Sequence, residues 1–146
     1  MKFFSTILLA LSFVFAGTVA QADSGYAKQK VVYHVNYNDA KRSIGAMRNA
    51  QNHINALGDG NYEIQFVLHG NGVELLRSVV NENSDAAGRV DSLRAQGVEF
   101  KICANTLKGR KIELEDLYFA DNSDVVPSGV AEIGKLQQEG FVYLRP

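Results

Sequence analysis

The sequence predicts an α/β fold with a largely parallel, five-stranded sheet and helices on both of its faces. Short runs rich in β-branched and aromatic residues alternate along the chain with segments in which apolar residues recur at helical spacing. This alternation is typical of parallel strands joined by right-handed helical crossovers. The run Phe66-Val67-Leu68 is apolar throughout, as expected for a strand that is covered on both sides.

The first 22 residues have the pattern of a secretory signal peptide. A basic start at Lys2 precedes an almost wholly apolar run over residues 3–16, and small residues follow at Ala20 and Ala22. Cleavage after Ala22 leaves 124 residues, enough for one domain with its own core, and predicts a periplasmic or secreted protein. The apolar run is shorter than the roughly 20 residues that span a bilayer, so we expect no membrane span after cleavage; an uncleaved N-terminal anchor is the alternative.

The first half of the domain is expected to contain two strands and a long helix. Residues 23–29 are polar and aperiodic, which predicts a flexible tail ahead of a domain over residues 30–146. Lys30–Asn36 is β-branched and aromatic and predicts the first strand. A helix over Asp39–Leu57 follows, with Gly58 in the position of a C-terminal cap. Its apolar positions are Ala40, Ile44, Met47, Ala50 or Gln51, Ile54 and Leu57.

The second half continues the alternation. Asn61 supplies a turn before the second strand, and the glycines after His69 end it. Ser84-Asp85 is expected to cap a helix that ends near Gly97. The predicted elements in order are strand Tyr62–Leu68, helix Val73–Val80, the helix after Ser84, strand Val98–Cys103, helix Ala104–Arg110, a turn or two over Glu113–Tyr118, strand Val125–Val126, a helix opened by Pro127-Ser128-Gly129 and closed by Gly140, and strand Phe141–Leu144.

Composition and missing motifs exclude several classes of protein. The formal net charge is −1, and −2 once Lys2 is removed, which disfavours nucleic-acid binding. Cys103 is the only cysteine, so no internal disulfide forms and zinc sites built on paired cysteines are excluded. The three histidines lack close ligand spacing, and no phosphate-binding loop, dinucleotide motif or G-x-S-x-G is present. We therefore expect no metal and no cofactor.

Ligands of parallel sheets bind beyond the carboxyl ends of the strands, which directs attention to Asn36–Asp39, His69–Gly72 and Cys103–Thr106. The glycine-containing turn after His69 can present backbone N–H groups to an anion; the alternative is a tight turn that needs positive φ. The predicted site consists of Cys103 and His69 as catalytic candidates and Gly70, Asn71, Gly72 and Asn105 as ligand-binding candidates.

Cys103 stands at the end of a strand and just before a short helix, where the partial positive charge of the helix start favours the thiolate. The position of Cys103 at the carboxyl end of the strands predicts a partly exposed thiol that attacks sulfur or other electrophiles. The alternative is that Cys103 is a small buried apolar residue. His69 either tunes the thiol and relays protons or faces solvent. The basic residues near Cys103 in sequence are Lys101, Lys108, Arg110 and Lys111.

The chain resembles the DsrE/DsrF-like family, the sulfur-relay group that includes the YchN-like proteins. The resemblance lies in the order and spacing of Val67–Val73, Gly97–Leu107, Val126–Val130 and Leu136–Leu144. It implies a three-layer α/β/α fold, assembly into trimers or hexamers, and a persulfide on Cys103 that passes from a sulfur donor to an acceptor protein. Because the well-known relay members are cytoplasmic and this chain carries an export signal, their partners are not expected here.

A function of a different class is a noncatalytic oligomeric module that binds a small anion or a partner protein, with Cys103 only lining the cleft. Assembly bears on both functions. The apolar ending Phe141–Leu144 can add a strand but leaves little to cover a sheet edge, which favours a homo-oligomer. The alternative is an interior strand in a monomer.

Overall fold

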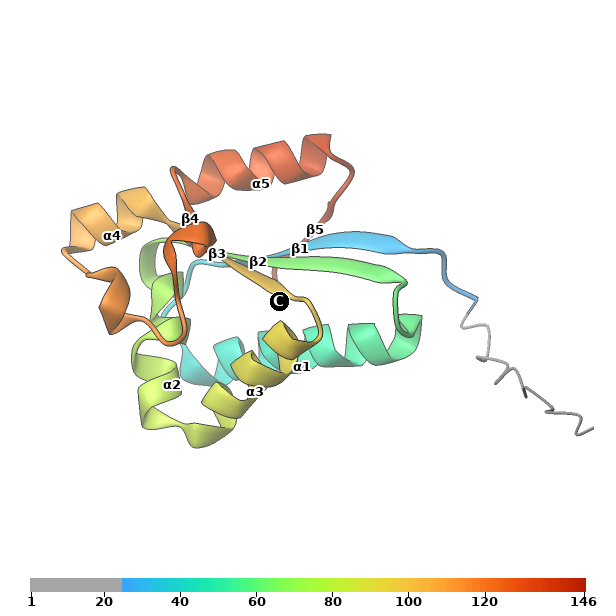
Figure 1. The fold of residues 1–146 in the computed structure, drawn as a ribbon, viewed down its shortest axis with the longest axis horizontal. Coiled ribbons are helices and arrows are strands. Elements are labelled where there is room, and N and C mark those ends of the chain that lie inside the picture. The colour runs from blue at the N-terminus through green and yellow to red at the C-terminus, as the bar shows by residue number, and fades with distance from the viewer. Residues whose placement is uncertain (1–24) are drawn as a thin grey trace, which may run out of the picture.

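The computed structural model of the chain describes residues 25–146 and contains one five-stranded, all-parallel sheet. Helices α1 (Ala40–Leu57) and α3 (Ser84–Ala95) cover one face, and α5 (Gly129–Gln138) covers the other (Figure 1). This confirms the predicted three-layer α/β/α fold. The strands are β1 (Gln29–Val35), β2 (Tyr62–Leu68), β3 (Glu99–Cys103), β4 (Val125–Val126) and β5 (Val142–Leu144), in the spatial order β4-β3-β2-β1-β5.

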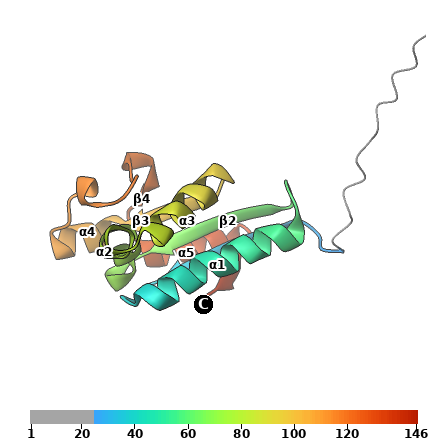
Figure 2. The ribbon, with the colours of Figure 1, turned by 90° about the horizontal axis from the view of Figure 1, so that it is seen from below.

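The core is unequal on the two faces of the sheet. Helices α1 and α3 contact each other and lie below the strands in the view of Figure 1, on the side that Figure 2 shows from below. On this side of the sheet the rings of Tyr33, Phe66 and Phe100 stack at 5.0 Å spacings. The smaller cluster on the α5 side consists of Val32, Val67, Ile133, Leu136 and Phe141. Because strand side chains alternate between faces, His34 and Cys103 point toward α5, opposite to the larger core.

Two helices differ from the prediction. The segment after β2 is not one helix over Val73–Val80 but a 3₁₀ helix, η1 (Gly70–Leu76), followed by α2 (Ser78–Glu82). The first turn of η1 packs directly against the end of β1, since a side chain at Gly72 would overlap the carbonyl oxygen of Val35. The N-cap of α3 is Asn83, not Ser84-Asp85, because the Asn83 side chain accepts hydrogen bonds from the first-turn N–H groups.

The ends of the domain also differ in detail from expectation. Gln29 is already part of β1, so the predicted tail is one residue too long. The predicted signal peptide, residues 1–22, lies outside the described residues. Within residues 25–146, no helix is long and apolar enough to cross a membrane.

Strand β5 is an edge strand, so the alternative of an interior strand is wrong. It pairs only with β1, and its three side chains remain accessible, with exposed fractions of 58% for Val142, 38% for Tyr143 and 36% for Leu144. The β5 edge is close to His34, because His34 lies on β1, the strand that pairs with β5.

Candidate functional site

Three neighbouring strands end at the same edge of the sheet and bring together residues far apart in sequence. His34 is the penultimate residue of β1, His69 follows β2 directly, and Cys103 is the last residue of β3. The parallel register aligns His34 with Val67 and therefore next to the β2 end. Helix α4 (Ala104–Arg110) begins directly after Cys103, as predicted.

The Cys103 sulfur lies among hydrogen-bond donors. The Thr106 hydroxyl and the backbone N–H groups of Gly129, Thr106 and Asn105 all donate to it. Burial by itself raises the pKa of the Cys103 thiol, but these hydrogen bonds outweigh it and hold the pKa below its ordinary value. The site therefore favours a thiolate, stabilised mainly by neutral donors.

The predicted partial exposure of Cys103 is wrong in this structure, because only 5% of the residue is accessible. The N-terminus of α5 covers it. A Cβ added at Gly129 would lie 3.3 Å from the Cys103 Cβ, 2.9 Å from the His69 Cβ and 3.4 Å from the His69 Cδ2. Glycine at position 129 thus lets the backbone at the start of α5 lie close to both Cys103 and His69.

The turn after β2 is connected to the thiol through Thr106. The Gly70 N–H donates to the Thr106 Oγ1 at 2.8 Å, and the same hydroxyl donates to Cys103. Arg110 holds this turn from α4, donating to the Gly70 carbonyl at 3.0 Å and pairing with the buried Glu74 at 2.5 Å. The turn is therefore part of the support of the thiol.

A chain of hydrogen bonds links His69 to the sheet edge. The Nε2 atoms of His34 and His69 are 2.7 Å apart, and their rings stack with centroids 4.7 Å apart. The other nitrogen of His34, Nδ1, lies 2.6 Å from the Tyr143 hydroxyl on β5. Among residues 25–146, the Nδ1 of His69 has no hydrogen-bond partner and remains available to a ligand.

Both histidines are held neutral near pH 7. Burial, then the proximity of His69 and of Arg145, lowers the pKa of His34 to about 4. Burial and the charge of Arg145 also lower the pKa of His69. Two neutral rings can exchange a proton without either storing a charge.

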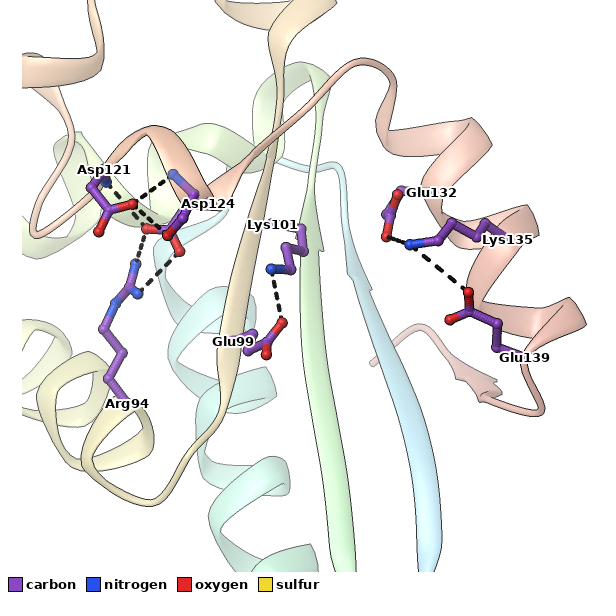
Figure 3. Close-up of polar contacts among 9 residues, drawn as sticks. Arg94, Glu99, Lys101, Asp121, Asp124, Glu132, Lys135 and Glu139 are labelled. Carbon is purple, nitrogen blue, oxygen red and sulfur yellow. Dashed lines mark hydrogen bonds and ion pairs between the residues drawn. The ribbon is translucent and has the colours of Figure 1, made fainter.

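The polypeptide leading to Gly129 is fixed by a largely buried ion pair. Arg94 on α3 contacts both carboxylate oxygens of Asp124, at 2.9 and 3.4 Å, directly before β4 (Figure 3). The Ser128 side chain then accepts from the Ala131 N–H and caps α5. These contacts hold the start of α5 over Cys103.

The basic residues near Cys103 in sequence have separate roles. Lys101 pairs with Glu99 on the same strand at 2.8 Å (Figure 3), and Arg110 is committed to Glu74. Lys108 and Lys111 form no ion pair within the described part of the chain, and they line a hollow of about 600 Å³ that reaches Ala104. Two of the four predicted charges are therefore neutralised locally.

The predicted ligand-binding residues divide into two kinds. Asn71 and Asn105 have exposed side chains at the rim. The N–H of Gly70 donates to Thr106, and that of Gly72 donates to the His69 carbonyl at 2.9 Å, so both already have acceptors. Anion binding at this turn stays a prediction. No group of three or more metal-ligating side chains converges within residues 25–146.

Sequence reasoning missed four residues of the site: His34, Thr106, Gly129 and Tyr143. One signal was present. His34 is a titratable residue within the otherwise apolar run Val31–Val35, where a buried polar side chain requires a partner. No sequence pattern near His34 or near Tyr143 indicates that Tyr143 is that partner.

Comparison with known proteins adds independent information. The sequence profile of the DsrE/DsrF-like family matches residues 20–146, which contain every described strand and helix. A solved structure of a protein of unknown function from Methanobacterium thermoautotrophicum has a TM-score of 0.69 and 35% identity, covering 81% of this chain and 99% of that one. No curated protein matches the chain.

Proposed function

This chain belongs to the DsrE/DsrF-like family, and on that premise we propose that it is a sulfur-relay protein in which Cys103 carries sulfane sulfur as a persulfide. The observation that carries the proposal is the set of donors around the Cys103 sulfur, which lowers its pKa despite burial. A thiolate is the form that attacks sulfur. One such thiolate, without a second cysteine, is sufficient for a carrier.

In the proposed loading step, the Cys103 thiolate attacks the outer sulfur of a donor R–S–SH. The new bond joins Cys103 Sγ to that sulfur, the donor S–S bond breaks, and its electron pair leaves with the inner sulfur as R–S⁻. The slight exposure of Cys103 favours a small or extended donor. His69, beside the thiol, is proposed to exchange the accompanying proton.

Mass spectrometry of the full chain tests this proposal. After treatment with polysulfide, we expect one or more added sulfur atoms on Cys103, removable by a thiol reductant, and none in Cys103→Ser. Alkylation of Cys103 against pH is expected to show an inflection below the value of about 8.5 that is usual for a thiol. An unmodified chain with an ordinary thiol pKa would refute the carrier role.

A noncatalytic binding module is the second candidate, favoured by the hollow lined by Lys108 and Lys111 next to α4. Its cationic rim suits a small anion. Thermal-shift measurements with sulfate and thiosulfate separate the candidates. Stabilisation that persists in Cys103→Ala and disappears in Lys108→Gln/Lys111→Gln would support binding without sulfur chemistry.

We also propose that the protein is exported and assembles into a homo-oligomer, a trimer or hexamer. Export is inferred from residues 1–22, and assembly from the exposed apolar side chains of Val142 and Leu144, which point to the face of the sheet opposite to Tyr143. N-terminal sequencing of the mature protein is expected to begin at Asp23, and light scattering is expected to give a multiple of the chain mass. An intact Met1, or a monomer at all concentrations, would contradict the respective inference.

A further inference from the structure

The hydrogen bonds between Tyr143, His34 and His69 have a property that a purely structural contact would not need. They run without interruption from β5, where Tyr143 is 38% exposed, to the histidine beside Cys103. At the inner end, the Nδ1 of His69 has no partner within residues 25–146. One end of these hydrogen bonds is therefore at the accessible β5 edge, and the other is at His69, whose Cβ and the Cys103 Cβ both lie within 3.3 Å of the position that a Cβ on Gly129 would take.

Two neutral rings joined through their Nε2 atoms can share only one proton at that contact. In the first state, Tyr143 donates to His34 Nδ1, His34 Nε2–H donates to His69 Nε2, and His69 Nδ1 carries a proton. In the second state, His69 Nε2–H donates to His34 Nε2, His34 Nδ1–H donates to the Tyr143 oxygen, and His69 Nδ1 is bare. The two states differ by one proton moved along each hydrogen bond.

We propose that Tyr143, His34 and His69 form a proton relay between the sulfur at Cys103 and solvent at the β5 edge, and that its two states alternate as Cys103 is loaded and unloaded. The proposal rests on the sulfur-carrier function proposed above. Tyr143 and His34 act through His69 and are positioning residues; His69 is the group that meets the reacting sulfur.

Loading converts the first state into the second. The leaving R–S⁻ takes the proton from His69 Nδ1 and departs as R–SH. His34 Nε2–H moves to His69 Nε2, the Tyr143 proton moves to His34 Nδ1, and the Tyr143 oxygen takes a proton from water. Cys103 then holds S–SH, and one solvent proton has been consumed.

Unloading restores the first state. The acceptor thiol A–SH gives its proton to the bare His69 Nδ1, and A–S⁻ attacks the outer sulfur of the Cys103 persulfide. The Cys103 S–S bond breaks, the sulfur leaves as A–S–SH, and Cys103 recovers its thiolate. A proton passes along the relay in the reverse direction and leaves at Tyr143, so the cycle closes with no net change.

The surroundings suit proton transfer between neutral groups. The charged and titratable groups that act on the two rings are Arg145 and Tyr143, together with each other, and Cys103 lies next to His69 beneath Gly129. Arg145 disfavours a stored positive charge on either ring, and burial acts in the same direction. Exchange of tautomers moves a proton without creating such a charge.

The test compares two reactions of Cys103 in the full chain. Sulfur transfer from glutathione persulfide needs a proton for its leaving group, whereas alkylation by iodoacetamide releases iodide and needs none. We expect Tyr143→Phe, His34→Gln and His69→Gln to slow transfer at least about tenfold, with alkylation rates and their pH dependence kept. Imidazole is expected to restore part of the transfer rate in His69→Gln.

Tyr33→Phe is the matched control. Tyr33 lies on the same strand as His34, but its hydroxyl forms a hydrogen bond of 3.1 Å with His53 Nδ1 and is outside the relay. This variant is expected to leave both reactions unchanged. Wild-type transfer rates in Tyr143→Phe, or alkylation that falls in parallel with transfer, would overturn the relay. Parallel loss would mean that these residues only tune the thiolate.

Nitrogen-15 spectra of the histidine rings test the relay independently of sulfur transfer. We expect His34 and His69 to occupy opposite or exchanging tautomers, and Tyr143→Phe to change the tautomer ratio of His69, which Tyr143 does not contact. Unchanged His69 signals would refute the relay. Absence of sulfur uptake with coupled tautomers would instead refute the carrier function and retain the proton connection.

Discussion

Gly129→Ala perturbs the site through the backbone alone. Alanine places a Cβ 2.9 Å from the His69 Cβ, a distance that real side chains essentially never adopt, so the start of α5 must move away from the site. The Gly129 N–H that donates to the Cys103 sulfur moves with it. We therefore expect a weaker thiolate with a raised pKa, although no side chain that contacts the sulfur is removed.

The size of the effect follows from the lost hydrogen bond. A hydrogen bond to a charged group contributes about 1.5–3 kcal/mol, and about 1.4 kcal/mol corresponds to a factor of ten. Loss of this one bond therefore slows Cys103 alkylation about tenfold at pH values below the inflection. Overpacking costs about 1–3 kcal/mol of folding stability in addition.

Iodoacetamide alkylation against pH measures the first effect, and urea denaturation measures the second. Gly134→Ala is the matched control in the same helix, since nothing lies within 4 Å of its added Cβ. It is expected to gain up to about 1 kcal/mol of stability and to leave alkylation unchanged. An alkylation profile of Gly129→Ala that matches the wild type would refute the assigned role of the Gly129 N–H.

Three further predictions concern stability, each measured by urea denaturation. Gly72→Ala is expected to cost at least about 3 kcal/mol, because its Cβ would overlap a β1 carbonyl oxygen, whereas Gly88→Ala, with open space around it, is expected not to destabilise. Asp124→Asn leaves a largely buried arginine without its carboxylate and is expected to cost about 3 kcal/mol of folding stability. Asp85→Asn, in an exposed ion pair, is expected to cost less than about 1 kcal/mol. Equal losses of stability in the two variants would contradict this prediction. The pKa of His34 is lowered to about 4, so the unfolded chain binds more protons between pH 6.5 and 4, and stability is expected to fall as pH falls through that window, on the order of 3 kcal/mol by pH 4. The same slope in His34→Gln would show that another group is responsible.

The sequence by itself determined the class of fold and two members of the site. Alternating strands and helices, caps and glycine turns are local patterns, and they located β2 at its observed bounds and Cys103 at the end of β3. His69 was found because it directly follows a strand. These predictions depend only on residues within a few positions of each other, which is why they needed no tertiary information.

Only the tertiary structure decided how the site is assembled. The Tyr143 hydroxyl meets His34 across 109 residues of sequence, and the Gly129 N–H reaches Cys103 because α5 crosses the face opposite α1 and α3. The first contact depends on β5 lying beside β1 at the edge of the sheet, and the second on β4 pairing with β3, which sets Val126 opposite Cys103. Strand order and the burial of the thiol arise from packing between distant segments, and local sequence carries no signal for that choice.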